Sequence, residues 1–189
     1  MIDVQNLNDV SSFLNKLDVQ WYINAGFALY LQDLPGDLSD VDIRVFYDDL
    51  AKLNKKFEYQ FAQKAHLRPP LDYKYGKYDT LCIELSLDVK YDIYSTMRIV
   101  RDGLGVINFP FDEDSFKSAR IIAFEGLRLP VASLEQLLPY YLVLRRNEFD
   151  VKTIKRIIAN NHFKQDVFDK YLRGFEKYRE IKDIYQDFI

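Results

Sequence analysis

The sequence has little of several residues on which common kinds of protein chemistry depend. Among its 189 residues there is one cysteine, Cys82, and there are two histidines, His66 and His162. A single cysteine cannot form a disulfide within the chain and is typical of proteins in a reducing compartment. Neither histidine has a cysteine or a second histidine at ligand spacing, which argues against a zinc site. The sequence also contains no Walker A motif and no Gly-x-Ser-x-Gly motif.

An excess of basic charge is missing as well. The 26 basic and 29 acidic residues give a net charge of −3, whereas proteins dedicated to duplex nucleic acid usually carry a basic surplus. No apolar run approaches the roughly 18 residues that a membrane-spanning helix needs, and the N-terminus lacks the pattern of a secretory signal. We therefore expect no membrane segment and a cytoplasmic protein.

Hydrophobic residues are abundant. They make up 48% of the chain and include 14 Tyr and 14 Phe, enough to fill a bulky core. Their spacing changes near Ser133: before it, short apolar runs alternate with helical segments, and after it all apolar spacing is helical. We therefore predict an α/β core over residues 1–133, followed by a C-terminal helical subdomain over residues 134–189.

The same spacing predicts individual elements. Helices are expected at 8–16, 26–34, 48–65, 134–146, 150–160 and 164–187, and strands at 19–24, 41–47, 80–86 and 88–94. Residues 120–131 predict a hairpin that turns at Glu125 and Gly126. The stretch 66–79, which contains proline and glycine, is expected to be a loop, and residues 103–105 a turn.

Two aspartates, Asp40 and Asp42, fall within a run that otherwise predicts a buried strand. Residues two apart in a strand project from the same face, about 6.6–7 Å apart at Cα. Two like charges there repel each other and resist burial, and a divalent cation relieves both costs. Magnesium favours carboxylate oxygens together with phosphate and water. The structural alternative is an Asp-x-Asp sequence that only caps a loop.

Gly26 and Asp92 extend this pattern. Gly26 follows a predicted strand and opens a predicted helix, where backbone N–H groups can approach a phosphate. Asp92 lies in a later strand and supplies a third carboxylate, with Glu84 and Asp88 as nearby alternatives. Three carboxylates from two strands can hold two metal ions for an in-line displacement at phosphorus.

Two stretches together resemble the nucleotidyltransferase signature of the DNA polymerase β superfamily: residues 25–31 (AGFALYL) and 39–42 (SDVD). The sequence is most similar to the AbiEii-like and aminoglycoside-nucleotidyltransferase-like branch, over about residues 19–160. The resemblance implies a mixed sheet with flanking helices. It also implies magnesium-dependent transfer of a nucleoside monophosphate from a nucleoside triphosphate, such as ATP, to a hydroxyl group of an acceptor.

The resemblance also implies roles for individual residues. Asp40 and Asp42 would bind two magnesium ions, and Asp92 would complete the shell of one ion and accept the proton of the attacking hydroxyl. Gly26 and Ser39 would contact the triphosphate. Further phosphate-binding candidates follow in the helical half: Arg145, Arg146 and Lys152.

The sequence departs from the family pattern around the predicted phosphate turn. The family usually has Gly-Gly or Gly-Ser there, whereas this chain has Ala25 and Phe27 on either side of Gly26. Tyr141 stands where related proteins tend to carry a lysine, and a tyrosine cannot supply positive charge to a triphosphate. These departures favour the alternative function, a non-catalytic protein of the same fold that binds or regulates a partner, for instance in a toxin–antitoxin pair. A small molecule, a protein side chain and RNA all stay open as acceptors.

Overall fold

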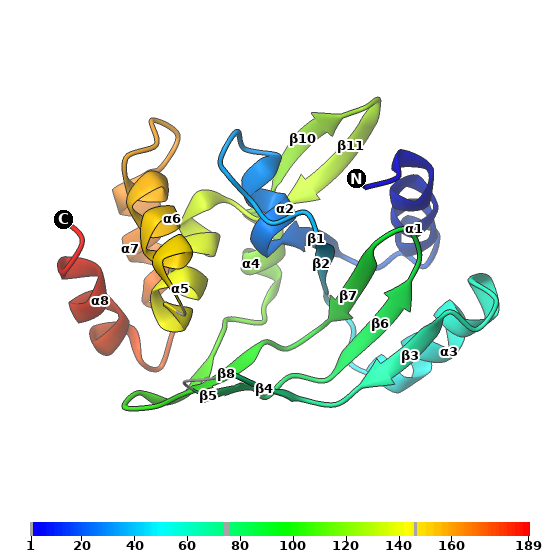
Figure 1. The fold of residues 1–189 in the computed structure, drawn as a ribbon, viewed down its shortest axis with the longest axis horizontal. Helices are drawn as coiled ribbons and strands as arrows, with labels where there is room; N and C mark the ends of the chain where they lie inside the picture. Colours follow the sequence, from blue (N-terminus) through cyan, green and yellow to red (C-terminus); the bar gives the residue numbers. More distant parts are fainter. Residues whose placement is uncertain (1, 74–75, 146) are drawn as a thin grey trace. The chain divides into compact units, whose positions relative to one another are not determined.

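A computed structural model describes residues 2–73, 76–145 and 147–189 and divides the chain into two compact units (Figure 1). The first unit contains Met1–Pro69, Leu81–Ser95 and Phe111–Ala132, and the second contains Pro70–Thr80, Thr96–Pro110 and Ser133–Ile189. The second unit therefore combines two strand-forming segments with the helices that follow Ser133. The domain boundary between residues 133 and 134 stays a prediction.

The first unit is built on a seven-stranded mixed sheet. Its strands follow the order β10, β11, β1, β2, β7, β6 and β3, in which the pairs β11–β1 and β2–β7 are parallel and the other neighbours are antiparallel. The strands are β1 (Trp21–Asn24), β2 (Asp40–Val45), β3 (Ala65–Arg68), β6 (Cys82–Ser86), β7 (Lys90–Tyr94), β10 (Arg120–Phe124) and β11 (Leu127–Val131). The helices are α1 (Val4–Lys16), α2 (Ala25–Tyr30), α3 (Leu50–Gln60) and α4 (Glu113–Lys117).

Helices α1 and α3 pack beside strands β3, β6 and β7 (Figure 1). Each begins at an aspartate whose side chain accepts a hydrogen bond from the first turn: Asp3 caps α1 and Asp49 caps α3. The two helices meet through Phe13 and Phe57, whose rings pack edge to face with centroids 4.9 Å apart. Their fully buried residues, such as Leu14 and Phe57, supply much of the core of this unit.

Alternate residues of the central strands differ in chemistry because they face opposite sides of the sheet. One row is apolar and fully buried, and its directly paired members are Ile23, Ile43, Ile93 and Ile83. The row that faces the other side is polar, and its directly paired members are Asn24, Asp42, Asp92, Glu84 and His66. The isoleucine row fixes the register of the strands, and this register places the polar side chains side by side.

The described residues of the second unit form a small sheet and four helices. The sheet is antiparallel, in the order β4 (Leu71–Tyr73), β5 (Gly76–Tyr78), β8 (Arg98–Arg101) and β9 (Gly105–Asn108). The helices are α5 (Leu134–Leu144), α6 (Glu148–Ile158), α7 (Gln165–Leu172) and α8 (Tyr178–Gln186). Every residue of α5 is buried, because the other three helices and β8 pack around it. The Arg101 side chain donates to the carbonyl oxygen of Leu144 at the end of α5, at 2.7 Å.

Most elements agree with the sequence predictions, but two predictions were wrong. The stretch 66–79 is not a loop: β3, β4 and β5 occupy its described residues, and Pro69 and Pro70 only separate the first two strands. The helix expected at 164–187 is two helices, because the chain turns between α7 and α8 around Gly174. Strands β8 and β9 and helix α4 were not predicted. The hairpin at 120–131 and the turn after Arg101 are confirmed.

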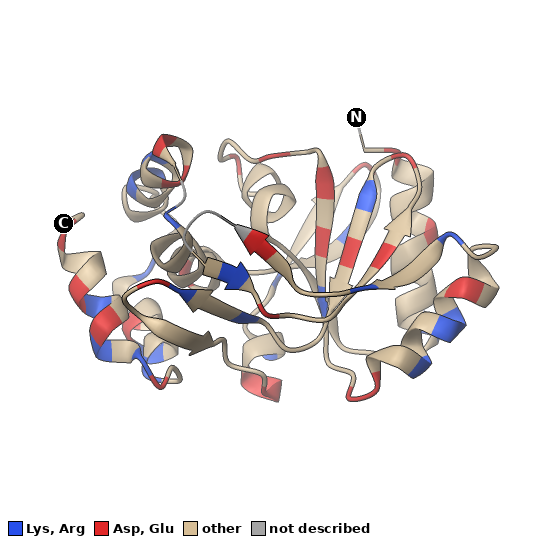
Figure 2. Cartoon of the chain, turned by 60° about the horizontal axis from the view of Figure 1, so that its bottom comes forward, with Lys and Arg blue, Asp and Glu red and all other residues tan. Residues whose placement is uncertain are grey.

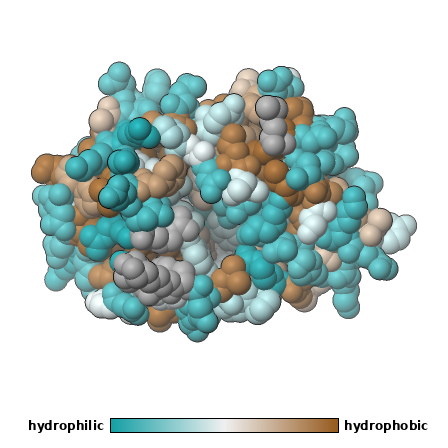
Figure 3. Space-filling model, viewed as in Figure 1, coloured by the Kyte–Doolittle hydropathy of each residue, from teal (hydrophilic) through white to brown (hydrophobic). Residues whose placement is uncertain are grey.

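Hydrophilic and hydrophobic side chains are interspersed on the face drawn in Figure 3. Among the helices of the described residues, none is both long enough and apolar enough to cross a membrane.

Candidate active site

The structure brings the three predicted carboxylates to one face of the first unit's sheet. Asp42 and Asp92 are directly paired across the parallel strands β2 and β7, and Asp40 lies two residues before Asp42 on the same face. Red acidic segments gather on neighbouring strands of this sheet in Figure 2. The Asp92 side chain is only 8% exposed, whereas Asp40 is 30% exposed. The sheet register therefore creates a cluster of like charges, one of them deeply buried.

The alternatives to Asp92 lie elsewhere. Glu84 is paired with Asp92 from the far side, on β6, and is one strand further from Asp42. Asp88 lies between β6 and β7, where its carboxylate accepts hydrogen bonds from the backbone of Asp3 and, at 2.9 Å, from the amide of Asn6. Of the three candidates, Asp92 is thus the one that adjoins Asp42.

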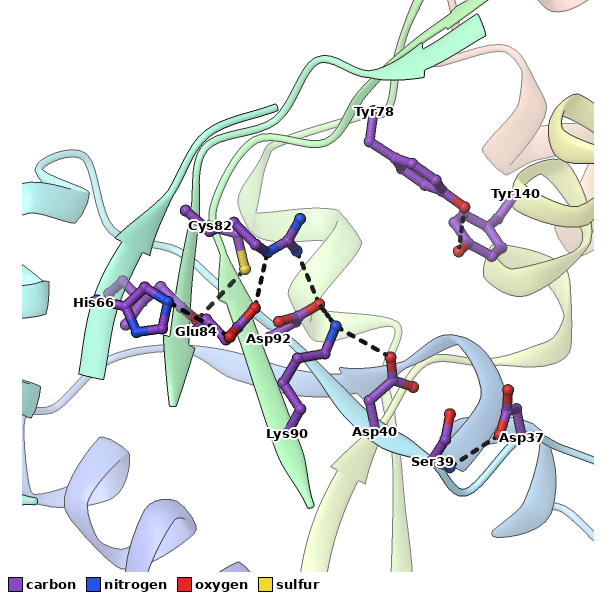
Figure 4. A network of polar contacts seen from close by, with 12 residues as sticks. Asp37, Ser39, Asp40, His66, Tyr78, Cys82, Glu84, Lys90, Asp92 and Tyr140 are labelled. Carbon is purple, nitrogen blue, oxygen red and sulfur yellow. Dashed lines mark hydrogen bonds and ion pairs between the residues drawn. The ribbon is translucent and has the colours of Figure 1, made fainter. Parts of the chain in front are cut away.

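Two cations contact the buried carboxylate. The Nζ atom of Lys90 lies 3.0 Å from Asp92 Oδ2 and 3.7 Å from Asp40 Oδ2. The Nη2 atom of Arg68 donates to the same Asp92 oxygen at 2.9 Å, and its Nε lies 3.3 Å from Glu84 Oε2. His66 Nε2 lies 3.5 Å from the other Glu84 oxygen. Figure 4 shows this network of alternating charges crossing the sheet from β3 to β2.

Burial and the uneven distribution of the two cations determine the directions of the pKa shifts in the cluster. Burial, together with the charges of Asp40 and Asp92, raises the pKa of the Asp42 carboxyl well above its usual value. Burial also raises the pKa of Asp40, although Lys90 opposes the shift. The pKa of Lys90 is raised, because its contacts with Asp92 and Asp40 outweigh its own desolvation. Asp42 makes no hydrogen bond or ion pair with other described residues, so it is the carboxylate with the least compensation.

The cluster has the ligand atoms that a magnesium ion prefers, but its side chains are not grouped as around a bound ion. Carboxylate oxygens are the ligands that magnesium prefers, and Asp92 Oδ1 is buried with no hydrogen-bond partner in the described structure. Within residues 2–73, 76–145 and 147–189, however, no three His, Cys, Asp or Glu side chains are grouped as around a metal ion. Since Arg68 and Lys90 already hold Asp92 Oδ2, the side chains suit one ion on Asp40 and Asp42 better than two.

The predicted triphosphate contacts are Gly26, in the first turn of α2, and Ser39, just before β2, and the turn between α2 and β2 packs tightly against Gly26. A Cβ atom on Gly26 would lie 2.5 Å from the carbonyl oxygen of Asp37, and one on Gly36 would lie 1.9 Å from the carbonyl oxygen of Gly26. The Ser39 N–H donates to Asp37 Oδ1 at 2.9 Å just before β2 begins. The turn itself therefore requires both glycines, and phosphate binding by Gly26 and Ser39 stays a prediction.

The residue before Gly26 has an unusual backbone. Ala25 has a φ of 49°, in the left-handed region that costs a non-glycine residue roughly 1–2 kcal/mol. The chain therefore enters α2 at the expense of backbone strain.

Three residues beside the cluster were not found from the sequence: Lys90, Arg68 and Asn24. Lys90 could have been found, because it precedes Asp92 by two residues and must share its face of the strand. Arg68 could not, because its stretch was predicted to be a loop. Asn24 is paired with Asp42 across β1 and β2, and its Nδ2 donates to the buried hydroxyl of Tyr94 at 2.7 Å.

The remaining predictions concern Arg145, Arg146, Lys152 and Cys82. Arg145 belongs to the second unit, where it ends α5 with a φ of 37°, and burial together with Arg101 lowers its pKa. Its role in nucleotide binding stays a prediction, as does that of Lys152, and Arg146 lies outside the described residues. Cys82 is buried, and burial raises the pKa of its thiol, so it is a poor nucleophile.

Comparison with known proteins identifies the fold. No protein family matches the sequence, and no curated protein does. Solved structures match over most of the chain. ANT(2")-Ia, solved with adenylyl-2"-tobramycin, matches with a TM-score of 0.57 and 11% identity over 96% of this chain and 98% of its own. The lincosamide adenylyltransferase LnuA, solved with lincomycin, matches with a TM-score of 0.53 and 14% identity over 84% and 98%.

A third structure agrees with these two. TM1012 from Thermotoga maritima, a candidate nucleotidyltransferase, matches with a TM-score of 0.51 and 23% identity over 85% of this chain and 97% of its own. The chain therefore has the nucleotidyltransferase fold. The resemblance seen in the sequence motif and the mixed α/β class are confirmed at the level of the fold. Because one fold can carry several functions, the activity has to be argued from the site.

Proposed function

We propose that this chain is a nucleotidyltransferase that moves a nucleoside monophosphate from a nucleoside triphosphate to a hydroxyl group of an acceptor. The observation that carries the proposal is the direct pairing of Asp42 with Asp92, with Asp40 on the same face, in a chain with this fold. In the reaction the acceptor oxygen bonds to the α-phosphorus while the bond from that phosphorus to the bridging oxygen breaks. Pyrophosphate leaves, and the acceptor hydroxyl gives up its proton.

The cluster divides the work among its carboxylates. Asp40 and Asp42 would hold magnesium, which when bound neutralises charge on the phosphates and on the leaving group. Asp92 is oriented by Arg68 and Lys90 through Oδ2, so its buried Oδ1 keeps a fixed position from which to accept the hydroxyl proton. Catalysis of this kind depends on positioning and charge, and no covalent enzyme intermediate is needed.

The acceptor is a small hydroxyl-bearing molecule, a protein side chain or an RNA end. LnuA was solved with lincomycin and ANT(2")-Ia with an adenylylated tobramycin, which are small molecules. The low identity to both proteins leaves the class of acceptor for this chain to be found by experiment.

Thermal unfolding with each of the four nucleoside triphosphates, with and without magnesium, tests the donor half of the proposal. A ligand at about 100 times its Kd stabilises the folded chain by about 2.7 kcal/mol, which raises Tm by several degrees. We expect one or more triphosphates to raise Tm only with magnesium, and Asp40→Asn to abolish this shift. Asp88→Asn removes a nearby carboxylate outside the cluster and is the matched control, which should respond like the wild type.

A non-catalytic binding role, for instance in a toxin–antitoxin pair, is the second candidate. Lys90 and Arg68 neutralise Asp92 without any metal ion, and this contact favours it. On that reading no triphosphate would change Tm, with or without magnesium. This result would reject the enzyme and turn the search to a protein partner.

A further inference from the structure

Lys90 lies between two carboxylates that a metal ion would otherwise join. It precedes Asp92 by two residues on β7 and is directly paired with Asp40 on β2, so all three side chains leave the same face of the sheet. Its Nζ lies 3.0 Å from Asp92 Oδ2 and 3.7 Å from Asp40 Oδ2 (Figure 4). A divalent ion held by these two carboxylates would supply positive charge between them, and the ammonium group supplies it as a charge tethered to the protein.

This contact differs from the ordinary surface ion pairs of the chain. Lys117 pairs only with Glu113, one turn away on the same helix, and both side chains are more than 60% exposed. Lys90 is 36% exposed and contacts two carboxylates, one of which is almost completely buried. An exposed pair contributes little to stability, whereas removal of the cation from a buried carboxylate leaves an uncompensated charge.

The charges of the cluster leave room for one divalent ion. In the described structure the cluster contains two cations, Lys90 and Arg68, and four carboxylates. Three of the carboxylates pair with these cations, and the fourth, Asp42, lies beside them: Asp40, Asp92, Glu84 and Asp42. Two negative charges then remain, which one divalent ion balances. A second ion on Asp92 Oδ2 would share that oxygen with two groups of its own sign within about 3 Å, and the repulsion at such distances is large in a partly buried site.

We propose that the ammonium group of Lys90 takes the place of one of the two divalent ions that the family resemblance implies, joining Asp40 to Asp92. The chain then binds a single divalent ion, held by Asp40 and Asp42. The single ion at this site rests on the proposed function, whereas the stand-in role of Lys90 can be tested without any nucleotide.

The test compares Lys90→Met with the wild type by thermal unfolding of the full chain, using Mn²⁺ as the probe. Methionine keeps an unbranched side chain and removes the charge. Without a divalent ion we expect Lys90→Met to lower Tm by about 3–8 °C, because Asp92 and Asp40 lose their shared cation. Millimolar Mn²⁺ should restore most of this loss, and it should shift the wild type by less than half as much. Lys117→Met is the control and should match the wild type throughout.

Two further variants identify the site of the effect. Lys90→Arg keeps the charge and should show little response to Mn²⁺, whereas Lys90→Met combined with Asp92→Asn should lose the rescue. An equal Mn²⁺ shift in Lys90→Met and the wild type would overturn the proposal. If Lys90→Met does not fold without a divalent ion, recovery of folded chain when Mn²⁺ is added supports the proposal. Failure to fold both with and without Mn²⁺ contradicts it.

The number of bound ions gives a second readout. Free Mn²⁺, measured by electron paramagnetic resonance with saturating non-hydrolysable triphosphate, should show one more bound ion per chain in Lys90→Met than in the wild type. An equal number would mean that Lys90 does not occupy an ion position. If no triphosphate binds to the wild type, the proposed function fails, and the Mn²⁺ rescue of Tm still decides the role of Lys90.

Discussion

Asp42 and Asp92 are direct neighbours across the parallel strands β2 and β7, and both Lys90 and Arg68 contact Asp92, whereas neither forms an ion pair with Asp42. Asp42 is left beside two other carboxylates, with its pKa raised well above the usual value by burial and by their charges. Such a side chain lowers the stability of the folded chain. Residues that cost stability while lying in a cluster of titratable groups are typical of functional sites.

The first prediction is that Asp42→Asn stabilises the chain at neutral pH in the absence of divalent ions. A carboxyl whose pKa is raised on folding binds its proton more tightly in the native state than in the unfolded state. Its contribution to stability therefore falls as the pH rises from the unfolded value, near 3.9, through the raised folded value. We expect a Tm for Asp42→Asn about 2–5 °C above that of the wild type at pH 8, with the difference shrinking towards pH 4.

Unfolding curves recorded between pH 4 and pH 8 check this prediction. Asp102→Asn changes an exposed aspartate in the turn after β8 and should leave the pH profile of the wild type unchanged. If Asp42→Asn instead lost stability as the pH rose, Asp42 would be a carboxylate stabilised by folding, and the electrostatic description of the cluster would be wrong.

The second prediction ranks the three candidates for the third carboxylate. Of the three candidates only Asp92 adjoins Asp42. Asp92→Asn leaves the charge of Lys90 to Asp40, where it competes with the ion, so this variant should remove most of the magnesium-dependent rise in Tm caused by the preferred triphosphate. Glu84→Gln should retain more than half of this rise in Tm. Asp88→Asn should retain all of it, because the Asp88 carboxylate lies outside the cluster and accepts hydrogen bonds from Asp3 and Asn6. Circular dichroism of each variant separates loss of binding from loss of fold. A larger effect of Glu84→Gln than of Asp92→Asn would reverse the assignment.

The sequence could predict that Asp40 and Asp42 share one face of a strand, because the two-residue period of a strand is a local property. Alternation alone places Asp40 and Asp42 on one face, and the apolar flanks of Asp92 place it in a strand. What the sequence could not predict is which strands pair. The register that sets Asp92 beside Asp42, and Glu84 beside Asp92, depends on contacts between residues tens of positions apart.

The errors of the sequence analysis have a common cause: proline and glycine were not reliable markers of where strands and helices end. Pro69, Pro70 and Gly76 made the stretch 66–79 look like a loop, although they fall between or at the start of short strands. Arg68, the residue that contacts both Asp92 and Glu84, was hidden by this error. Gly174 is the reverse case: it lies within the helix expected at 164–187, and α7 ends at Leu172, just before it.

The third prediction concerns the turn that leads into β2. A Cβ atom on Gly36 would lie 1.9 Å from the carbonyl oxygen of Gly26, and backbone on both sides leaves no flexible side chain to move away. We expect Gly36→Ala to destabilise the chain by about 1–3 kcal/mol, as overpacking in a core does. The variant should also weaken triphosphate binding, because the displaced turn carries Ser39 and Asp40.

Urea unfolding and the triphosphate-induced rise in Tm measure these two effects. Gly103→Asn is the control: no described atom outside its chain neighbours lies within 4 Å of a Cβ at this position, and asparagine tolerates its φ of 81°. It should stay within about 1 kcal/mol of the wild type. A Gly36→Ala chain of wild-type stability would show that the turn can open without cost, and that a glycine is not needed at position 36.

The fourth prediction concerns the hydrogen bond from Asn24 Nδ2 to the hydroxyl of Tyr94, at 2.7 Å between two buried side chains. This bond joins β1 to β7 across β2. It therefore fixes the position of Asn24, which is paired with Asp42. Tyr94→Phe leaves the Asn24 amide without its buried acceptor and should cost about 1–3 kcal/mol in urea unfolding. Asn24→Ala removes the donor, so the double variant should lose about 0.5–1.5 kcal/mol less than the sum of the single losses.

Tyr91→Phe is the matched control on the same strand. The Tyr91 hydroxyl lies 3.5 Å from Asp88 Oδ1, a weak contact whose removal should cost less than about 1 kcal/mol. Strictly additive losses in Tyr94→Phe and Asn24→Ala would show that the bond contributes nothing to the fold. A coupling of the expected size would mean that a polar bond from β1 to β7 holds the strands around Asp42 in register, while the isoleucine row does so on the opposite face.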